Sequence, residues 1–276
     1  MWTFENRPRY NRDHLRYPSD LTDEEWSIVE PLIPPGKPGG GKRRVSLREV
    51  VNGVMYILST GCQWRYLPKD LPPRSTVHDY LSLWNWDGTL DRIHHELYAK
   101  CREKAQREAS PTACIVDSQS VKSAEKGGLV SIRPALAKLI KGKTRHVLVD
   151  TQGLLMNGMV TAADVQDREG GLALLGTLFS LFPFLTKLFA DSAYEGPIFH
   201  TALATILPHL KTEIIKRSDR IPGFVALPKR WIVERTIAWL NRCRRLAKDW
   251  ENLNRNALAF LKLASIRLML RKLCNP

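Results

Sequence analysis

The sequence lacks any long apolar run. Nowhere do 18 consecutive apolar residues occur, and the first 20 residues contain no apolar segment of the kind found in signal peptides. We therefore expect neither secretion nor insertion into a membrane.

Cysteine is scarce and is not arranged for metal binding or cross-linking. The five cysteines form no CxxC pair and no spacing typical of a zinc site or a disulfide framework. We expect a reducing, intracellular setting, and we interpret each cysteine as a small buried hydrophobic residue. The five are Cys62, Cys101, Cys114, Cys243 and Cys274.

Acidic residues are too few to balance the basic ones. The chain has 42 Lys and Arg against 28 Asp and Glu, a formal charge of +14. From Lys211 onward there are 16 basic and 5 acidic residues, so +11 of the charge lies in that part. Basic residues that serve only solubility would be spread evenly. The distribution predicts a polyanionic partner, nucleic acid foremost.

The pattern along the 276 residues predicts two domains. Residues 1–20 are expected to form an irregular basic arm. Residues 21–107 show helical periodicity throughout, and residues 110–276 alternate between strand and helix signals. The second part predicts an α/β fold, a mixed sheet flanked by helices.

Helix-start and helix-stop signals divide the first domain. Thr22 is the expected cap of the first helix, and Pro35–Arg44 is a basic linker. Ser46 and Glu49 have the spacing of a capping box, and they open an apolar helix that Gly61 ends.

Two further helices surround a tight turn. Ser75 or Thr76 is expected to cap a short helix that breaks at Asp87–Gly88, and a longer helix follows from about 90 to 107. This spacing resembles a helix-turn-helix, but helix pairs also occur without DNA contact, so base readout by residues 76–86 is an open alternative. We interpret four aromatic residues here as packing groups: Trp64, Tyr80, Trp84 and Trp86.

Two apolar runs in the second domain each end in aspartate followed by serine, at Asp117 and Asp191. If both runs are strands of one sheet, both carboxylates emerge at the same edge. Mg²⁺ prefers oxygen ligands and takes one or two carboxylates from a protein. Two such ions, about 3.5 to 4 Å apart, suit phosphodiester cleavage. The remaining elements are expected as a hairpin turning at Asp150–Gly153, helices at about 168–182 and 196–207, a short strand at 213–218 and a helical region from Pro228.

A third carboxylate is expected from a helix, and Glu234 is the candidate. It is the only acidic residue among seven basic ones between 228 and 248, and Arg230 lies one helical turn before it. The alternative is a surface salt bridge between Glu234 and Arg230 on a helix that binds phosphate without cleaving it.

Other polar residues have simpler interpretations. Asp150 suits a hairpin turn, and Asp167 precedes a helix that it would cap. His94, His95 and His146 have no partners at metal spacing. No histidine is placed to activate Ser118 or Ser120 as a nucleophile.

Several runs of the sequence closely resemble the DDE transposases of bacterial insertion sequences, in the group called insertion sequence five. The resemblance covers about 110–255, and the segment from Leu21 to Gly88 resembles the N-terminal domain of that group. The runs that carry it are VDSQSVKSAEKGG, KGKTRHVLVDTQGLL, AADVQDREG, FADSAYEG, EIIKRSD and GFVALPKRWIVERTIAWLNRCRRLAKDWE.

The resemblance implies an RNase H-like catalytic fold and a catalytic, metal-binding triad of Asp117, Asp191 and Glu234. Arg230 matches the arginine that these enzymes place four residues before the glutamate. Their tyrosine and lysine would fall at Leu227 and Asn241, so neither is present, and Arg242 is a neighbour that could take over. Residues 131–143 are also more apolar than the corresponding segment of relatives.

The function that the resemblance implies is transposition. Such an enzyme binds the ends of its insertion sequence, cuts them with two Mg²⁺ or Mn²⁺ ions and joins the 3′ ends to target DNA. It would act as a homodimer on DNA, in the cytoplasm with the nucleoid. The expected DNA contacts are Lys42, Arg43, Arg44, Arg74, Ser75, His78, Lys122, Lys126, Lys229, Arg230, Arg235, Arg242 and Arg245. The alternatives are an inactive DNA-binding regulator derived from a transposase and an RNase H-like repair nuclease.

Overall fold

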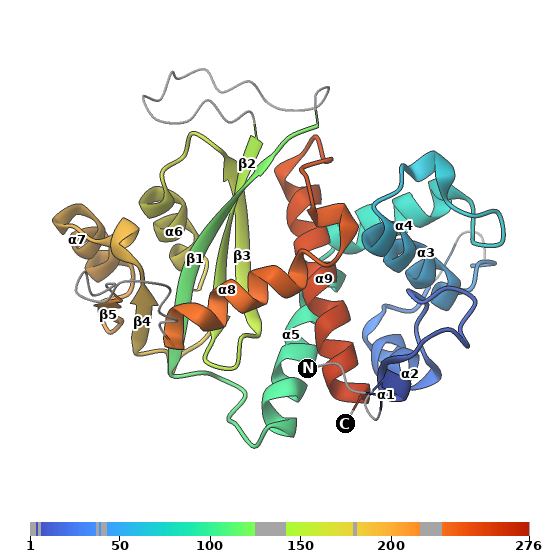
Figure 1. The fold of residues 1–276 in the computed structure, drawn as a ribbon, viewed down its shortest axis with the longest axis horizontal. Helices are drawn as coiled ribbons and strands as arrows, with labels where there is room; N and C mark the ends of the chain where they lie inside the picture. Colours follow the sequence, from blue (N-terminus) through green and yellow to red (C-terminus); the bar gives the residue numbers. More distant parts are fainter. Residues whose placement is uncertain are drawn as a thin grey trace.

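A computed structural model describes residues 4, 7–36, 39, 43–124, 142–178, 181–215 and 228–275. A five-stranded sheet and a group of N-terminal helices lie on either side of the long helix α9 (Asn254–Cys274), as Figure 1 shows. None of the helices among these residues is long and apolar enough to cross a membrane.

Local signals account for most of the N-terminal helices. Thr22 and Glu25 form a reciprocal capping box, with Thr22 Oγ1 accepting the Glu25 N–H at 3.2 Å and Glu25 Oε2 accepting the Thr22 N–H at 3.1 Å. Gly61 ends the third helix in the left-handed conformation, at φ 68°. The elements are α1 (Arg7–Tyr10), α2 (Asp23–Val29), η1 (Glu30–Leu32), α3 (Leu47–Thr60), η2 (Trp64–Tyr66), α4 (Arg74–Trp86) and α5 (Thr89–Lys104).

The predicted capping box of Ser46 and Glu49 was wrong. Ser46 precedes α3 but makes no capping hydrogen bond with its side chain. Glu49 instead accepts the Asn52 amide at 3.0 Å and pairs with Arg16 at 2.8 Å. The Glu49 carboxylate, which the local pattern assigned to the helix cap, is therefore engaged in an ion pair with Arg16 instead.

Helix α4 begins one residue before the caps that the sequence predicted. Pro73 occupies its N-cap position, so Ser75 and Thr76 lie inside the first turn. The interpretation of the aromatic residues as packing groups was wrong for Trp86, whose side chain is 79% exposed, whereas Trp84 is buried.

The sheet is mixed, with the strand order β3-β2-β1-β4-β5. β2 pairs antiparallel with both β1 and β3, whereas β4 pairs parallel with both β1 and β5. This confirms the RNase H-like fold. The strands are β1 (Ala113–Lys122), β2 (Gly142–Asp150), β3 (Leu155–Ala162), β4 (Lys187–Ala190) and β5 (Lys211–Ile214).

Helices cover both faces of the sheet (Figure 1). A Cβ added to Gly170 of α6 would meet His146 of β2, whereas one added to Gly158 of β3 would meet Leu261 of α9. Since Gly158 pairs with Val147, the neighbour of His146, helices α6 and α9 lie on opposite faces. The helices of this part are α6 (Asp167–Gly176), η3 (Ser192–Tyr194), α7 (Pro197–Ile206), α8 (Pro228–Leu240), η4 (Arg244–Leu246) and α9.

Three predicted boundaries in the second domain differ from the structure. β1 does not end at Asp117 but continues to Lys122, because β2 pairs with it over that whole length. Helix α6 ends at Gly176 instead of near 182. The last strand, β5, begins at Lys211, two residues earlier than expected, and residues 216–218 lie outside the described residues.

Polar contacts connect the helical part to the sheet. Asp150, which is fully buried in the β2–β3 turn, forms an ion pair with Arg102 of α5 and accepts the Tyr98 hydroxyl at 3.3 Å. Its Oδ1 also accepts two backbone N–H groups of the turn, the structural role that the sequence indicated. In the same interior, His94 of α5 bonds to Ser265 of α9 at 3.1 Å.

The five cysteines are free thiols in the structure. Cys101, Cys114 and Cys243 are buried, as expected for small hydrophobic residues. Cys62 and Cys274 are only half-buried, so the same interpretation was wrong for those two.

Candidate active site

The sheet places Asp117 and Asp191 side by side. β1 and β4 are parallel neighbours with Ile115 opposite Phe189, and each aspartate lies two residues further along its strand. Asp191 follows the last residue of β4 and caps η3, its Oδ1 accepting the Ala193 N–H at 2.9 Å. The end of one strand and the middle of the next therefore present two carboxylates together.

Helix α8 brings the third carboxylate to this pair. The helix packs on β1 and β4. Arg230 Nε donates to Glu234 Oε1 at 2.9 Å, and Arg230 Nη2 lies 3.8 Å from Asp191 Oδ2. One guanidinium thus bridges a carboxylate of the helix and a carboxylate of the sheet.

Asp117, like the other two carboxylates, is partly buried. Burial raises the pKa of its carboxyl to about 6, and the negative charges of Asp191 and Glu234 act in the same direction. The Ser118 N–H, which donates to Asp117 Oδ1 at 2.8 Å, and the charge of Arg230 lower that pKa. Ionisation of Asp117 is therefore unfavourable unless a cation in addition to Arg230 lies nearby.

The donor set fits a hard divalent cation. All three candidate ligands are carboxylates, the oxygen donors that Mg²⁺ and Mn²⁺ accept. Within the described part of the chain, no three acidic, histidine or cysteine side chains are gathered as closely as a closed metal site requires. Arg230 stands between Asp191 and Glu234. This arrangement suits an open site, with one or two carboxylates per ion and the remaining positions left to water and phosphate.

Three residues beside the triad were missed or misread from the sequence. The Ser118 hydroxyl donates to Asp167 Oδ1 at 2.7 Å, and Gln166, not Asp167, holds the N-cap position of α6. Tyr194 is buried three residues after Asp191. No local pattern could have indicated the contact between Ser118 and Asp167, because 49 positions separate them.

The candidate DNA-binding residues fall into three groups. Lys42 and Lys126 lie outside the described residues. Arg245 is only 7% exposed and pairs with Glu251 at 2.6 Å, so its place on a DNA surface is withdrawn. Side chains with exposed or half-buried positions remain available: Arg43, Arg44, Arg74, Ser75, His78, Lys122, Lys229, Arg230, Arg235 and Arg242.

The sequence departs from the expected transposase pattern at two positions, and the structure describes one of them. Leu227 lies outside the described residues. Asn241 follows α8, and its amide donates to Gln119 Oε1 of β1 at 3.0 Å. Its carbonyl oxygen accepts from Arg145 at 3.4 Å. Asn241 therefore ties the end of α8 to the sheet.

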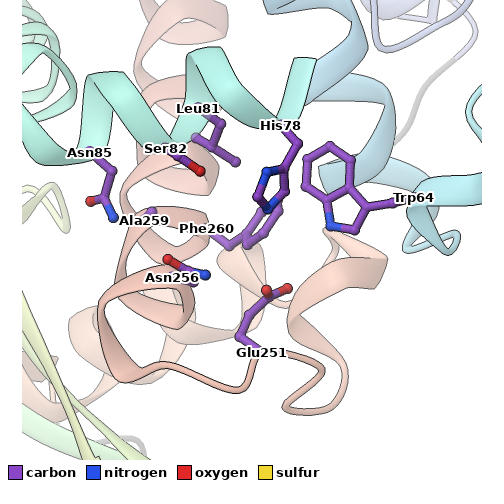
Figure 2. A pocket seen from close by; sticks show the side chains of 9 residues that line it. All are labelled: Trp64, His78, Leu81, Ser82, Asn85, Glu251, Asn256, Ala259 and Phe260. Carbon is purple, nitrogen blue, oxygen red and sulfur yellow. The ribbon is translucent and has the colours of Figure 1, made fainter. Parts of the chain in front are cut away.

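A small pocket lies between α4 and the segment that leads into α9 (Figure 2). His78 and Asn85 of α4 line one side, Glu251 and Asn256 line the other, and Trp64 stands edge-on to His78 with ring centroids 5.1 Å apart. His78 is one of the expected DNA contacts, so the C-terminal segment borders the face that α4 would present to DNA.

Comparison with known proteins agrees with the mixed sheet. Residues 108–269 match the family described as "Transposase DDE domain", and residues 21–94 match "Putative transposase of IS4/5 family". The chain belongs to the DDE transposases, a family whose members act on DNA and generally use divalent metal ions. It is also similar to the "Insertion element IS402 uncharacterized 16.2 kDa protein" of Burkholderia cepacia. The two are 36% identical over 124 residues, which are 43% of this chain and 83% of that protein.

Proposed function

We propose that this transposase binds the inverted-repeat ends of its own insertion sequence, cleaves the phosphodiester there and joins the freed 3′ ends to target DNA. The observation that carries the proposal is the convergence of Asp117, Asp191 and Glu234 from β1, the end of β4 and α8, with Arg230 between them. Both reactions are displacements at phosphorus, so one site can serve both.

The three carboxylates are the proposed ligands of two Mg²⁺ or Mn²⁺ ions. Bound there, the ions would supply an activated water and stabilise the departing 3′ oxygen. Asp117 contributes a carboxylate from β1, which pairs with β2 at that position. Glu234 is oriented by Arg230, whose Nε holds Oε1, and it approaches from the helix side.

Arg230 has a second proposed role toward the DNA. Its side chain is 44% exposed, and the guanidinium has more donors than its two carboxylate partners use. Arginine pairs well with phosphate because its planar donors match two oxygens at once. We place the scissile phosphate within its reach, beside the carboxylates.

Residues 21–107 are the proposed end-recognition domain, and 110–276 the catalytic domain. The exposed face of α4 carries Arg74, Ser75 and His78, a cation and two hydrogen-bonding side chains suited to the DNA backbone or to base edges. Lys122, Lys229, Arg235 and Arg242 are proposed phosphate contacts near the catalytic centre. Because two ends must be brought together, we propose a homodimer on DNA.

A duplex carrying the element's terminal inverted repeat tests the proposal. With Mg²⁺ or Mn²⁺, the wild type is expected to nick the labelled duplex at the end of the repeat. Asp117→Asn, Asp191→Asn and Glu234→Gln are expected to bind the same duplex and leave it uncut. Glu169→Gln is the matched control, because Glu169 is an exposed carboxylate in the first turn of α6.

Other outcomes would contradict the proposal. Cleavage by the three carboxylate variants at the wild-type rate would remove the triad from the active site. A wild type that binds the end but never cuts would be the inactive regulator. Cutting of branched DNA without preference for the repeat would favour the repair nuclease.

A further inference from the structure

Among the residues that the structure describes, strand β1 has a strand neighbour on only one side at Asp117. β4 pairs with β1 from Ala113 to Ile115 and goes no further, whereas β2 pairs with it as far as Lys122. The backbone of Asp117 and Ser118 therefore has β2 on one side and, within the described part of the chain, no strand on the other. A backbone held from one side is more easily displaced, so a carboxylate at this position needs another anchor.

Ser118 provides such an anchor on the other face of the strand. Adjacent side chains of a strand point to opposite faces. Asp117 points toward the side where α8 lies, as does Gln119, which bonds to Asn241. Ser118 points toward α6, where its hydroxyl donates to Asp167 Oδ1 at 2.7 Å. Because the Ser118 N–H also donates to Asp117 Oδ1, a shift of Ser118 would move that carboxylate.

Helix α6 is a firm support because two glycines let it lie close to the sheet. A Cβ on Gly170 would stand 2.1 Å from Nε2 of His146, and one on Gly171 would stand 2.5 Å from Cε1 of Tyr194. Both distances are far below ordinary contact, so α6 packs against these rings without a gap. Asp167, the first residue of α6, is thereby fixed relative to β2 and η3.

Tyr194 connects the same helix to the second aspartate. It lies in η3, which Asp191 caps, and its ring packs on Gly171 of α6. Burial raises the pKa of its hydroxyl, the charges of Asp167, Asp117 and Asp191 raise that pKa further, and the Ser118 side chain beside the hydroxyl lowers it. Helix α6 therefore supports both aspartates, one through Ser118 and the other through Tyr194.

We propose that Asp167 is a positioning residue of the catalytic centre, which holds Asp117 in place through the Ser118 hydroxyl. The inference rests on the proposed function, because it takes Asp117 as a catalytic carboxylate. Asp167 is not itself a metal ligand in this proposal, and its action requires the hydroxyl of Ser118.

The first test uses metal-free protein and no reaction. Hydrogen exchange of the backbone amides of β1 is compared among the wild type, Asp167→Ala and Asp167→Asn. The alanine variant is expected to speed exchange around Ser118 while the β2–β3 pairing keeps its protection. The asparagine variant, whose side-chain oxygen can still accept the hydroxyl, is expected to restore most of the protection.

The second test is a double-mutant cycle on cleavage of the repeat duplex. Asp167→Ala and Ser118→Ala are each expected to lower kcat roughly ten- to a hundredfold, the usual effect of losing a group that orients a ligand. DNA affinity is expected to stay within about twofold. Because both variants remove the same hydrogen bond, the one between Ser118 and Asp167, the double variant should be no slower than the slower single variant.

Two matched controls accompany the cycle. Ser120→Ala removes a hydroxyl that bonds to Thr144 at 3.2 Å and lies on the same face of β1 as Ser118. Glu169→Ala removes a carboxylate from the turn of α6 that contains Asp167. Both are expected to cleave at the wild-type rate.

Three results would overturn the inference. These are an unchanged kcat in Asp167→Ala, losses that multiply in the double variant, or unchanged exchange at Ser118. If Asp167→Ala fails to fold, Ser118→Ala removes the same bond and decides the question. If Asp117→Asn cleaves at the wild-type rate, the proposed function itself is wrong. If Asp117→Asn is inactive while Asp167→Ala cleaves normally, only the role of Asp167 is wrong.

Discussion

Arg230 binds Glu234 across one turn of α8, with Nε 2.9 Å from Oε1, while its Nη2 lies 3.8 Å from Asp191 Oδ2. The guanidinium of Arg230 thus lies between the carboxylates of Asp191 and Glu234, where a metal ion would also bind. The side chains of Arg230 and Glu234 are 44% and 41% exposed, so their pairing contributes at most about 1 kcal/mol to stability.

Replacing Arg230 by glutamine should therefore separate stability from metal binding. In metal-free Arg230→Gln, the free energy of unfolding is expected to fall by no more than about 1 kcal/mol. Affinity for Mn²⁺ without DNA, measured by calorimetric titration, is expected to rise because a competing cation has gone. Lys229→Gln is the control, since it removes an equal charge that pairs with Glu213 instead. A lower Mn²⁺ affinity in Arg230→Gln would show that the arginine organises the ligands more than it competes for them.

The raised pKa of Asp117 predicts a pH-dependent gain in stability from Asp117→Asn. The carboxyl titrates at about 6 in the folded protein and at about 3.9 when unfolded. Between these values the folded state holds the proton more tightly, so stability falls as the pH rises from about 4 to about 6 and then stays level. At pH 7 the metal-free variant is expected to exceed the wild type by up to about 3 kcal/mol, with no difference at pH 4.

Urea unfolding at pH 4 and pH 7 measures this difference. Mn²⁺ should reverse the order at pH 7, because the asparagine variant has lost a ligand and gains less from the ion. A difference that is the same at both pH values would mean that burial does not disfavour the charge of Asp117.

Local patterns predicted the elements that carry the triad. The apolar runs before Asp117 and Asp191 are neighbouring strands, and Glu234 lies on a helix, because the spacing of apolar residues reports which face is buried. The pattern placed Asp117 at the end of its strand, which was wrong. A strand's length depends on its partner, and β2 continues to pair as far as Lys122.

The supporting contacts could not be predicted from the sequence. The whole β2–β3 hairpin lies between Ser118 and Asp167 in the sequence, so only the folded sheet brings them together. Arg245 lies in a strongly basic segment, which predicted a contact with DNA. In the structure it is buried and forms an ion pair with Glu251. In each case a tertiary partner, not the neighbouring sequence, decides the role of the side chain.

The close docking of α6 predicts opposite effects at two of its glycines. Gly171→Ala would push a methyl group into Tyr194 and is expected to destabilise the protein by about 1–3 kcal/mol. Gly176→Ala in the same helix meets nothing within 4 Å and is expected to be stabilising by about 0.4–1 kcal/mol. Thermal unfolding of the two variants measures both effects. Equal effects would mean that α6 does not lie against Tyr194.

A buried ion pair holds the segment after α8 against the sheet. Lys143 Nζ of β2 lies 3.2 Å from Asp249 Oδ2, and both side chains are at most 3% exposed. Asp249 Oδ2 also accepts the Ser123 hydroxyl at 3.0 Å. Lys143→Met leaves the carboxylate buried without its cation and is expected to cost about 3–5 kcal/mol of unfolding free energy.

Removing both charges should recover most of that loss, because apolar side chains of similar volume need no partner. Lys143→Met with Asp249→Leu is therefore expected to be more stable than Lys143→Met alone in chemical denaturation. Lys187→Met is the exposed comparison, since its pair with Glu213 is 46% exposed on each side and should contribute at most about 1 kcal/mol. If the double variant is as unstable as Lys143→Met, the bonds that Lys143 donates to the Glu251 and Asn252 carbonyls, together with the bond between Ser123 and Asp249, matter more than the ion pair.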